Sequence, residues 1–265
     1  MILAGFALFG LFGPMLAPRD PTKQSLTDTL LPPAFMDGGR SQYLLGTDQL
    51  GRDVLSRLLA GTQVSFFVAV GAVLVAGSIG LFVALVGGFL GGRVDAILTR
   101  VADASMAFPV LLLAIVVVAV FGKGIVIVIL VLVLAVWPQY ARVLRSEVVT
   151  VRNQDFVTMS RIMGGSSWWS ITRHVLPNLV PTFLVLATLQ LGLAIIAEGS
   201  LSFLGIGVQP PAASWGNMLA DGRNYLATAW WIPVIPGMCL SATVLAANLT
   251  GDWLRQALDP ATRRR

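Results

Sequence analysis

Long stretches without charged residues constrain this 265-residue chain more than any other feature of its sequence. A helix that crosses the roughly 30 Å hydrocarbon core of a bilayer needs about 20 mostly apolar residues, because each adds about 1.5 Å. Stretches that meet or approach this length occupy residues 1–18, 58–92, 104–122, 124–141, 179–197 and 224–251. The sequence therefore predicts an all-α membrane protein with six transmembrane helices.

The first of these stretches allows two interpretations. It begins at Met1 without a basic flank and contains Pro14 and Pro18, whereas a signal peptide has a positively charged N-terminal region and a small-residue cleavage site. Only the short run ending at Ala17 resembles such a site. We expect a true first transmembrane helix at residues 1–18.

The composition supports a membrane protein and excludes several functional classes. Hydrophobic residues make up 56% of the chain, charged residues make up 12%, and the mean hydropathy is +0.81. One Cys and one His exclude a disulfide framework and a metal site built from Cys and His of this chain alone. Cys239 lies in an apolar stretch, where we expect a packing role.

Enzymatic chemistry finds no support in the motifs. A membrane hydrolase would need a Ser-His pair or an H-E-x-x-H site, and the only His, His174, has no glutamate at that spacing. No G-x-x-x-x-G-K-[ST] phosphate loop occurs, so any ATP that drives this protein must be hydrolysed by other subunits. We expect a non-catalytic chain that binds no cofactor and no metal.

The distribution of Arg residues predicts the orientation in the membrane. Eleven of the 18 Lys and Arg residues lie in three segments that the positive-inside rule places in the cytoplasm. They are Arg93, Arg100, Arg142, Arg145, Arg152, Arg161, Arg173, Arg255, Arg263, Arg264 and Arg265. The C-terminus is then cytoplasmic, and the net charge of +5 reflects this bias and anionic lipid headgroups, not a nucleic-acid partner. We divide the chain into a first helix (1–18), an external loop (19–63) and a core (64–265) with a cytoplasmic insert at about 142–178.

The insert has the pattern of two short helices. Phe156, Met159 and Met163 fall on one helical face, and Gly164-Gly165 is typical of a left-handed helix stop. Ser166 or Ser167 can cap a second helix, which we expect to end at Pro177. A polar, helix-forming insert between membrane spans suggests that the chain transmits force to a partner outside the lipid.

Small residues recur every four positions along the second predicted span. They are Ala72, Ala76, Gly80, Ala84, Gly88 and Gly92. This spacing predicts that another helix approaches closely, since small side chains let helix backbones come together in lipid. The sequence does not separate tight packing from a hinge function.

Three passages resemble one known family. Residues 46–57 (GTDQLGRDVLSR) resemble the external signature before the second helix of dipeptide, oligopeptide and nickel permeases of bacterial ABC importers. Residues 201–216 (LSFLGIGVQPPAASWG) resemble the passage after their fifth helix, and the tail from Asn248 to Pro260 resembles their C-terminal motif. The order of the Gly164 turn, a fixed interval and Leu176-Pro177 resembles their coupling loop. The resemblance is strongest to the second, or "C", permease subunit.

This resemblance implies the type I ABC importer permease fold and a set of partners. They are a homologous permease subunit that shares the translocation path, two ATPases that bind ATP and Mg, an external binding protein, and the lipid bilayer of the bacterial inner membrane. The ATPase-coupling residues would be Phe156, Thr158, Met159, Ser160, Arg161, Met163, Gly164, Gly165, Leu176 and Pro177. One departure is that Thr158-Met159-Ser160 replaces the usual Glu-Ala-Ala; because the acidic residue and one Ala are lost, we expect no specific ion pair with the ATPase here, while Gly164 and Leu176-Pro177 remain.

Other candidate residues keep two interpretations each. Asp103 is either structural or path-lining, Glu198 either reaches the membrane interface or acts in a gate, and Gln190 either ties helices together or lines the path. Pro211 and Trp215 belong either to a binding-protein contact or to a structural cap. We expect di- or oligopeptides as the cargo, with nickel or another small solute as the second candidate. An ion-coupled secondary transporter is a less favoured alternative, because it would be expected to show paired repeats and acidic groups near the midplane, whereas this chain has six unequal predicted spans and a long insert.

Overall fold

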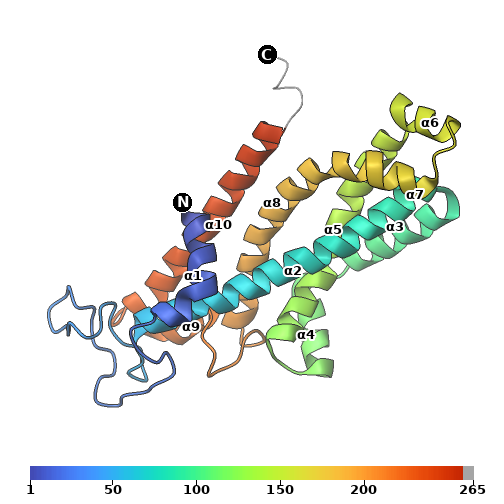
Figure 1. Cartoon of the computed structure of the whole chain (residues 1–265). Coiled ribbons are helices and arrows are strands. Elements are labelled where there is room, and N and C mark those ends of the chain that lie inside the picture. Colours follow the sequence, from blue (N-terminus) through green and yellow to red (C-terminus); the bar gives the residue numbers. More distant parts are fainter. Residues whose placement is uncertain (259–265) are drawn as a thin grey trace. The chain divides into compact units, whose positions relative to one another are not determined.

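The computed structural model describes residues 1–258, apart from the Arg161 side chain, and these residues are mostly helical (Figure 1). The helices are α1 (Ile2–Leu16), α2 (Val54–Leu90), α3 (Gly92–Met106), α4 (Val110–Phe121), α5 (Ile125–Arg152), α6 (Asp155–Ile162), α7 (Ser167–Ser170), α8 (Leu176–Phe203), α9 (Trp215–Gly222) and α10 (Trp231–Leu258). A π-helical turn (Ile171–Val175) joins α7 to α8, and a 3-10 turn (Arg223–Tyr225) follows α9. Asp259, Pro260 and Arg263 to Arg265 of the predicted C-terminal motif and basic tail lie outside the described residues.

The described helices confirm the all-α membrane class. Four are long and apolar enough to cross a bilayer: α2, α5, the run Ser167–Phe203 that includes α8, and α10. The bent pair of α3 and α4 makes a fifth span if it is counted as one, and α1 is a shorter apolar helix of 15 residues. The predicted number of six is reached only when both of these are included.

The third predicted span, residues 104–122, is interrupted. α3 ends at Met106, α4 begins at Val110, and the two helices meet at an angle of 89°. Pro109 lies in the break; it has no N–H to donate and disfavours the helical conformation of Phe108. The predicted start at residue 104 is therefore wrong, and the apolar part of this span is the 12-residue α4.

The prediction that the second helix of the insert ends at Pro177 is also wrong. Helical structure continues from Ser167 through Pro177 and Pro181 to Phe203. The π-helical turn just before Pro177 changes the hydrogen-bond register, because the Leu176 N–H donates to Ile171 O, five residues back. A proline near such a turn interrupts few helical hydrogen bonds, so the insert runs directly into the fifth span.

The chain divides into two compact units that share the four long helices. Unit 1 comprises residues 1–71, 114–131 and 191–247, and unit 2 comprises residues 72–113, 132–190 and 248–265. In unit 1, α1 packs through Phe6, whose ring centre lies 5.5 Å from those of Phe66 and Trp215. Gly10 and Gly13 bring the same helix against Phe66 and Leu59, which supports the interpretation of residues 1–18 as a helix of the fold.

The small residues of α2 make a close contact with α5 in unit 2. Ala72, Ala76 and Ala84 are at most 1% exposed. A Cβ placed on Gly80 would lie 2.8 Å from Trp137 O and 2.9 Å from Ala141 N, both backbone atoms of α5, and would also meet the Tyr140 side chain. The predicted close approach is confirmed for this stripe except at Gly92, which lies beyond the end of α2 and is exposed.

Replacing Gly80 by alanine should destabilise the protein by about 1–3 kcal/mol, because the contacting backbone atoms of α5 cannot move as a side chain could. Gly71→Ala is the matched control, since a Cβ there would meet only Ile129 Cδ1 at an ordinary 3.5 Å. Thermal unfolding of the two variants in detergent measures the difference. Equal unfolding temperatures would show that α2 and α5 can separate at no cost.

Candidate functional site

A tight turn ends α6 within the predicted insert (about 142–178), in the segment between α5 and α8. Gly164 has a φ of +87°, and the Gly165 N–H donates to Ser160 O at 2.9 Å, five residues back. This is the hydrogen bond of a Schellman motif, in which the residue after the helix takes a left-handed conformation. A Cβ on Gly165 would lie 2.7 Å from Ser160 O, so both glycines are needed. The predicted left-handed stop is confirmed.

The surface of α6 carries an exposed apolar stripe. Phe156, Met159, Ile162 and Met163 are 43%, 60%, 75% and 85% exposed, whereas Val157 between them is fully buried. Val157 therefore anchors α6 to the fold, and the large apolar side chains on its other faces remain largely exposed among the described residues. Thr158 is exposed and Ser160 is half-buried, so Ser160 is a weaker contact candidate.

The second half of the insert is capped and tied to α6. Ser166 is the N-cap of α7, and its Oγ accepts from the Trp169 N–H at 3.2 Å, which settles the choice between Ser166 and Ser167. The rings of Phe156 and His174 lie 5.7 Å apart, and this contact joins α6 to the π-helical turn. Trp168 and Trp169 are 74% and 55% exposed and extend the apolar surface. Leu176 and Pro177 follow at the start of α8, where Pro177 is exposed.

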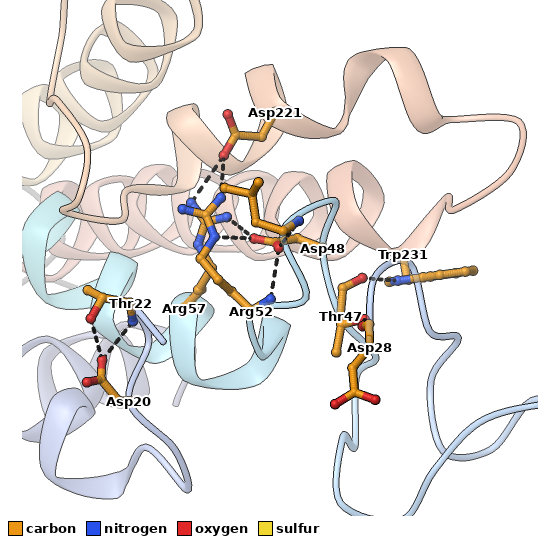
Figure 2. Close-up of polar contacts among 10 residues, drawn as sticks. Asp20, Thr22, Asp28, Thr47, Asp48, Arg52, Arg57, Asp221 and Trp231 are labelled. Atoms are coloured by element: carbon orange, nitrogen blue, oxygen red, sulfur yellow. Dashed lines mark hydrogen bonds and ion pairs between the residues drawn. The ribbon is translucent and has the colours of Figure 1, made fainter. Parts of the chain in front are cut away.

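The motif at residues 46–57 folds around a buried arginine–aspartate cluster in unit 1 (Figure 2). The Arg52 Nε donates to Asp48 Oδ2 at 2.7 Å, and Arg57 pairs with the same oxygen. Both guanidinium groups also reach Asp221 Oδ2 on α9, at 3.3 Å and 3.2 Å. The Asp48 and Arg57 side chains are only 1% and 4% exposed. Two cations and two anions balance, and they tie the loop before α2 to α9.

The same motif fixes the loop that precedes α2 (residues 17–53). The Thr47 hydroxyl donates to Asp28 O at 2.5 Å, and the Trp231 Nε1–H donates to Thr47 O at 3.1 Å (Figure 2). Gly46 has a φ of +77°, and a Cβ placed on it would lie only 2.5 Å from Leu31 O and 3.0 Å from the Trp231 Nε1, so no larger residue fits there. The helix α2 begins at Val54, inside the predicted external loop of residues 19–63.

Carboxylates order the rest of this loop. Asp28 accepts from the Ser25 hydroxyl at 2.9 Å and the Tyr43 hydroxyl at 3.1 Å and pairs with Arg40. The hydrogen bond from Ser25 is the main cause that lowers the pKa of Asp28, whereas burial is the main cause that raises the pKa of Tyr43. Asp53 caps α2, since its Oδ2 accepts from the Ser56 N–H at 2.9 Å and the Ser56 hydroxyl at 2.6 Å.

Glu198 is the centre of a second buried polar group, also in unit 1. Its side chain has no exposed surface, and it accepts from the Ser65 hydroxyl of α2 at 2.9 Å and the Ser202 hydroxyl at 2.8 Å. Ser214, the N-cap of α9, also hydrogen-bonds to it. Ser202 in turn accepts from the Val208 N–H at 3.2 Å. Glu198 therefore holds both ends of the hairpin that joins α8 to α9 (residues 204–214).

The two binding-protein candidates differ in exposure. Pro211 lies on the surface of the hairpin. Trp215 is only 3% exposed, and its Nε1–H donates to Leu58 O at 3.3 Å. In this structure Trp215 supports the hairpin from inside and presents no surface to another protein.

The remaining path candidates lie in unit 2 and make specific contacts. Asp103 on α3 pairs with Arg142 on α5 at 2.5 Å, and its side chain is 52% exposed. Gln190 on α8 is 6% exposed and donates to Gln139 Oε1 on α5 at 2.5 Å. Gln190 Oε1 and the Tyr140 hydroxyl are buried without a hydrogen-bond partner among the described residues.

Several of these partners were not predicted from the sequence. Asp221, Ser65 and Gln139 lie 164, 133 and 51 positions from the residues that they contact. The motif itself gives no sign of a further acid, because Asp48 and Asp53 already match Arg52 and Arg57 in number. The one available signal was Glu198 at the end of an apolar stretch, which suggests that hydroxyl groups donate to it. That signal does not identify which distant residue supplies the contact.

Comparison with known proteins gives a consistent result. Residues 76–264 match the family model described as "Binding-protein-dependent transport system inner membrane component". The chain is 41% identical over 250 residues to the Di/tripeptide transport system permease protein DppC of Pseudomonas aeruginosa, which covers 94% of this chain and 82% of that protein. It is 37% identical over 260 residues to the Probable D,D-dipeptide transport system permease protein DdpC of Escherichia coli, with 98% and 85% covered.

A solved structure supports the fold. The inward-facing MetNI methionine ABC transporter matches with a TM-score of 0.58 and 17% identity, over 77% of this chain and 96% of that one. At such low identity the match supports the type I importer fold alone. Taken with the family model and the relatives, it shows that the chain belongs to the binding-protein-dependent transport system inner membrane component family, the non-catalytic permease subunits of ABC importers.

Proposed function

We propose that this permease moves di- or oligopeptides, delivered by an external binding protein, along a path shared with a homologous permease subunit. Two ATPase subunits would bind ATP and Mg and supply the energy. The observation that supports peptides as the cargo is sequence identity along nearly the whole chain: 41% to a permease named for di/tripeptides and 37% to one named for D,D-dipeptides. Nickel or another small solute is the second candidate, because the sequence motifs are shared with nickel permeases.

Uptake by reconstituted vesicles tests the cargo. Vesicles that contain the permease pair, the ATPases and the loaded binding protein should accumulate a labelled dipeptide when ATP is present. A tenfold excess of unlabelled dipeptide should compete, and Ni²⁺ should not. Uptake that follows an imposed ion gradient without ATP would contradict the importer mechanism, and competition by Ni²⁺ alone would favour the second cargo.

We propose that the insert faces the cytoplasm and docks on an ATPase. The Arg distribution supports this side, and the exposed apolar stripe of Phe156, Met159 and Met163 supplies a surface for a protein partner. Continuous helix from Ser167 to Phe203 connects that surface to a membrane span. A displacement of the insert would therefore move α8 directly, without a flexible linker.

The path and gate candidates receive different roles in this proposal. Glu198 would act in a gate through the hairpin that it holds, not by contacting cargo, because its carboxylate is fully buried. Gln190 would be the path candidate with a free acceptor, Oε1, if the helices around it separate during transport. Asp103 would serve mainly to pair α3 with Arg142 of α5.

The purified chain alone should hydrolyse no ATP, because it lacks a phosphate loop. The measurement is phosphate release by the chain in detergent, compared with the chain mixed with its ATPase partners. Turnover that co-purifies with this chain after every contaminating ATPase is removed would contradict its role as a non-catalytic subunit.

The hairpin should respond differently to changes at its surface and in its interior. Pro211→Ala should weaken stimulation of ATP turnover by loaded binding protein while basal turnover stays unchanged, because Pro211 is exposed. Trp215→Ala should lower both basal and stimulated turnover. It removes a buried aromatic side chain, which should lower the free energy of unfolding by about 3 kcal/mol. Both turnovers are measured in reconstituted vesicles. Unchanged stimulation in Pro211→Ala would leave the hairpin as a structural cap.

A further inference from the structure

A cavity of about 470 Å³ lies in unit 2, where α5 ends, α8 begins and α10 ends. Its volume is within the range of about 300–1,000 Å³ that is typical of small-molecule sites. Both charged and apolar side chains line it, and those that decide its chemistry are Glu147, Arg255, Val151, Pro181, Val185 and Leu258. Of the lining residues, only Pro177 is also a proposed coupling residue.

The cavity lies across the boundary between apolar and polar sequence. Val185 belongs to the apolar stretch of α8, whereas Arg255 and Glu147 follow the apolar stretches of α10 and α5 by four and six residues. At about 1.5 Å per residue, Arg255 is about 6 Å and Glu147 about 9 Å beyond the apolar part of its helix. The headgroup layer of a bilayer is about 5–8 Å thick on each side. Trp253, which is 64% exposed, is of the residue type enriched at this level.

The cavity presents two opposite charges that the protein leaves without a partner. Glu147 is half-buried and Arg255 is exposed, and neither side chain makes a hydrogen bond or ion pair with another described residue. The Thr150 hydroxyl in the same wall differs, because it donates to Ser146 O at 3.0 Å within α5. An acid and a base are therefore both available to a ligand.

This combination of charges excludes simple ions. Glu147 would repel an anion, Arg255 would repel a cation, and no group of three or more side chains suited to a metal ion occurs in the described part of the chain. A zwitterion satisfies both charges. The apolar part of the wall, which includes the 6% exposed Val151, gives such a ligand a place for hydrocarbon next to its charges.

We propose that the cavity binds the headgroup of a phospholipid that carries a primary ammonium group, as phosphatidylethanolamine does. Its phosphate would lie on Arg255, its ammonium group on Glu147, and the first part of its acyl chains on Val185 and Leu258. A guanidinium group matches phosphate geometry, and a carboxylate accepts from an ammonium N–H. Arg255 is nearer to the apolar sequence than Glu147 is, just as the phosphate of this lipid is bonded nearer to the acyl chains than the ammonium group. The site does not depend on the cargo or the ATPase contact proposed above.

Thermal unfolding of the purified full chain in detergent tests the site, because a ligand of the folded state raises the unfolding temperature as its concentration rises. The probes are dihexanoyl phosphatidylethanolamine, dihexanoyl phosphatidylcholine and glycerophosphoethanolamine. The first should act at concentrations at least about tenfold lower than the other two. The quaternary ammonium of the choline lipid has no N–H for Glu147, and glycerophosphoethanolamine has no acyl chains.

Two variants assign the two ends of the lipid. Glu147→Gln should remove the preference for the ethanolamine lipid over the choline lipid. Arg255→Gln should weaken both lipids alike, by about tenfold, because both contain the phosphate. Asp252→Asn and Arg100→Gln are the matched controls, since both positions are exposed and lie outside the cavity, and both variants should keep the preference.

Three results would overturn the proposal. The first is equal stabilisation of the wild-type chain by the ethanolamine and choline lipids, or by dihexanoyl phosphatidylglycerol, which has no ammonium group. The second is a full effect of glycerophosphoethanolamine, which would make the site one for a soluble molecule. The third is a lower unfolding temperature of Glu147→Gln without lipid and an unchanged lipid preference, which would show that Glu147 and Arg255 pair with each other.

Discussion

Replacing Gly164 by valine should lower ATP-driven uptake by about tenfold while membrane insertion persists. The residue has a φ of +87°, a conformation that a β-branched side chain strongly disfavours, and a cost of about 1.4 kcal/mol corresponds to a factor of ten in the population of the turn. A Cβ on Gly164 would meet nothing within 4 Å, so the effect comes from the backbone alone. Loss of the turn would displace α6, with its exposed apolar stripe, from α7.

Gly122→Val is the matched control for this prediction. Gly122 has a φ of +82° and open space around its Cβ position, but it joins α4 to α5, far along the chain from the insert. Uptake by vesicles and protein yield in the membrane are measured for both variants. If Gly122→Val loses as much uptake as Gly164→Val, strain in general is responsible; normal uptake by Gly164→Val would remove the turn from the mechanism.

Local signals in the sequence were reliable where one short segment decides the structure. The Gly164 stop, the serine cap of α7 and the small-residue stripe of α2 depend on backbone conformation and size within a few positions. Apolar length likewise located the long spans, because it depends on composition alone. These features belong to both the fold and the proposed docking segment.

Two proline positions show where a local rule is insufficient. Pro109 breaks a helix as proline usually does, whereas Pro177 and Pro181 lie inside a continuous helical run. The difference at Pro177 is the π-helical turn of residues 171–175, which no property of the proline itself predicts. The sequence therefore could not show that the insert and the fifth span form one helical element.

Tertiary contacts of the polar motifs were the least predictable part. The sequence presented residues 46–57 only as a family signature, and it gave Trp215 as a contact candidate although the side chain is buried. Asp221 and Ser65 become visible as partners only when distant helices are placed together. Charge balance gave no clue to Asp221, because the two arginines of the motif are already matched by Asp48 and Asp53.

Replacing Arg57 by methionine should destabilise unit 1 by about 3 kcal/mol. Removing one partner of a buried ion pair leaves an uncompensated charge, which typically costs about 3–5 kcal/mol, and the lower end applies because Arg52 still donates to Asp48. Chemical unfolding in detergent measures the free energy. Hydrogen exchange of residues 17–53 should increase at the same time, because Arg57 ties that loop to Asp221 of α9.

A comparison with Arg40→Met separates burial from charge. Arg40 forms the same type of pair with Asp28 in the same loop, but its side chain is 52% exposed against 4% for Arg57, so its loss should have a far smaller effect. The double variant Asp48→Asn with Arg57→Met should be more stable than the sum of the single effects predicts, because neither charge is then left alone. Additive effects, or equal effects of Arg40→Met and Arg57→Met, would show that water reaches the arginine–aspartate cluster and that it does not hold the loop to α9.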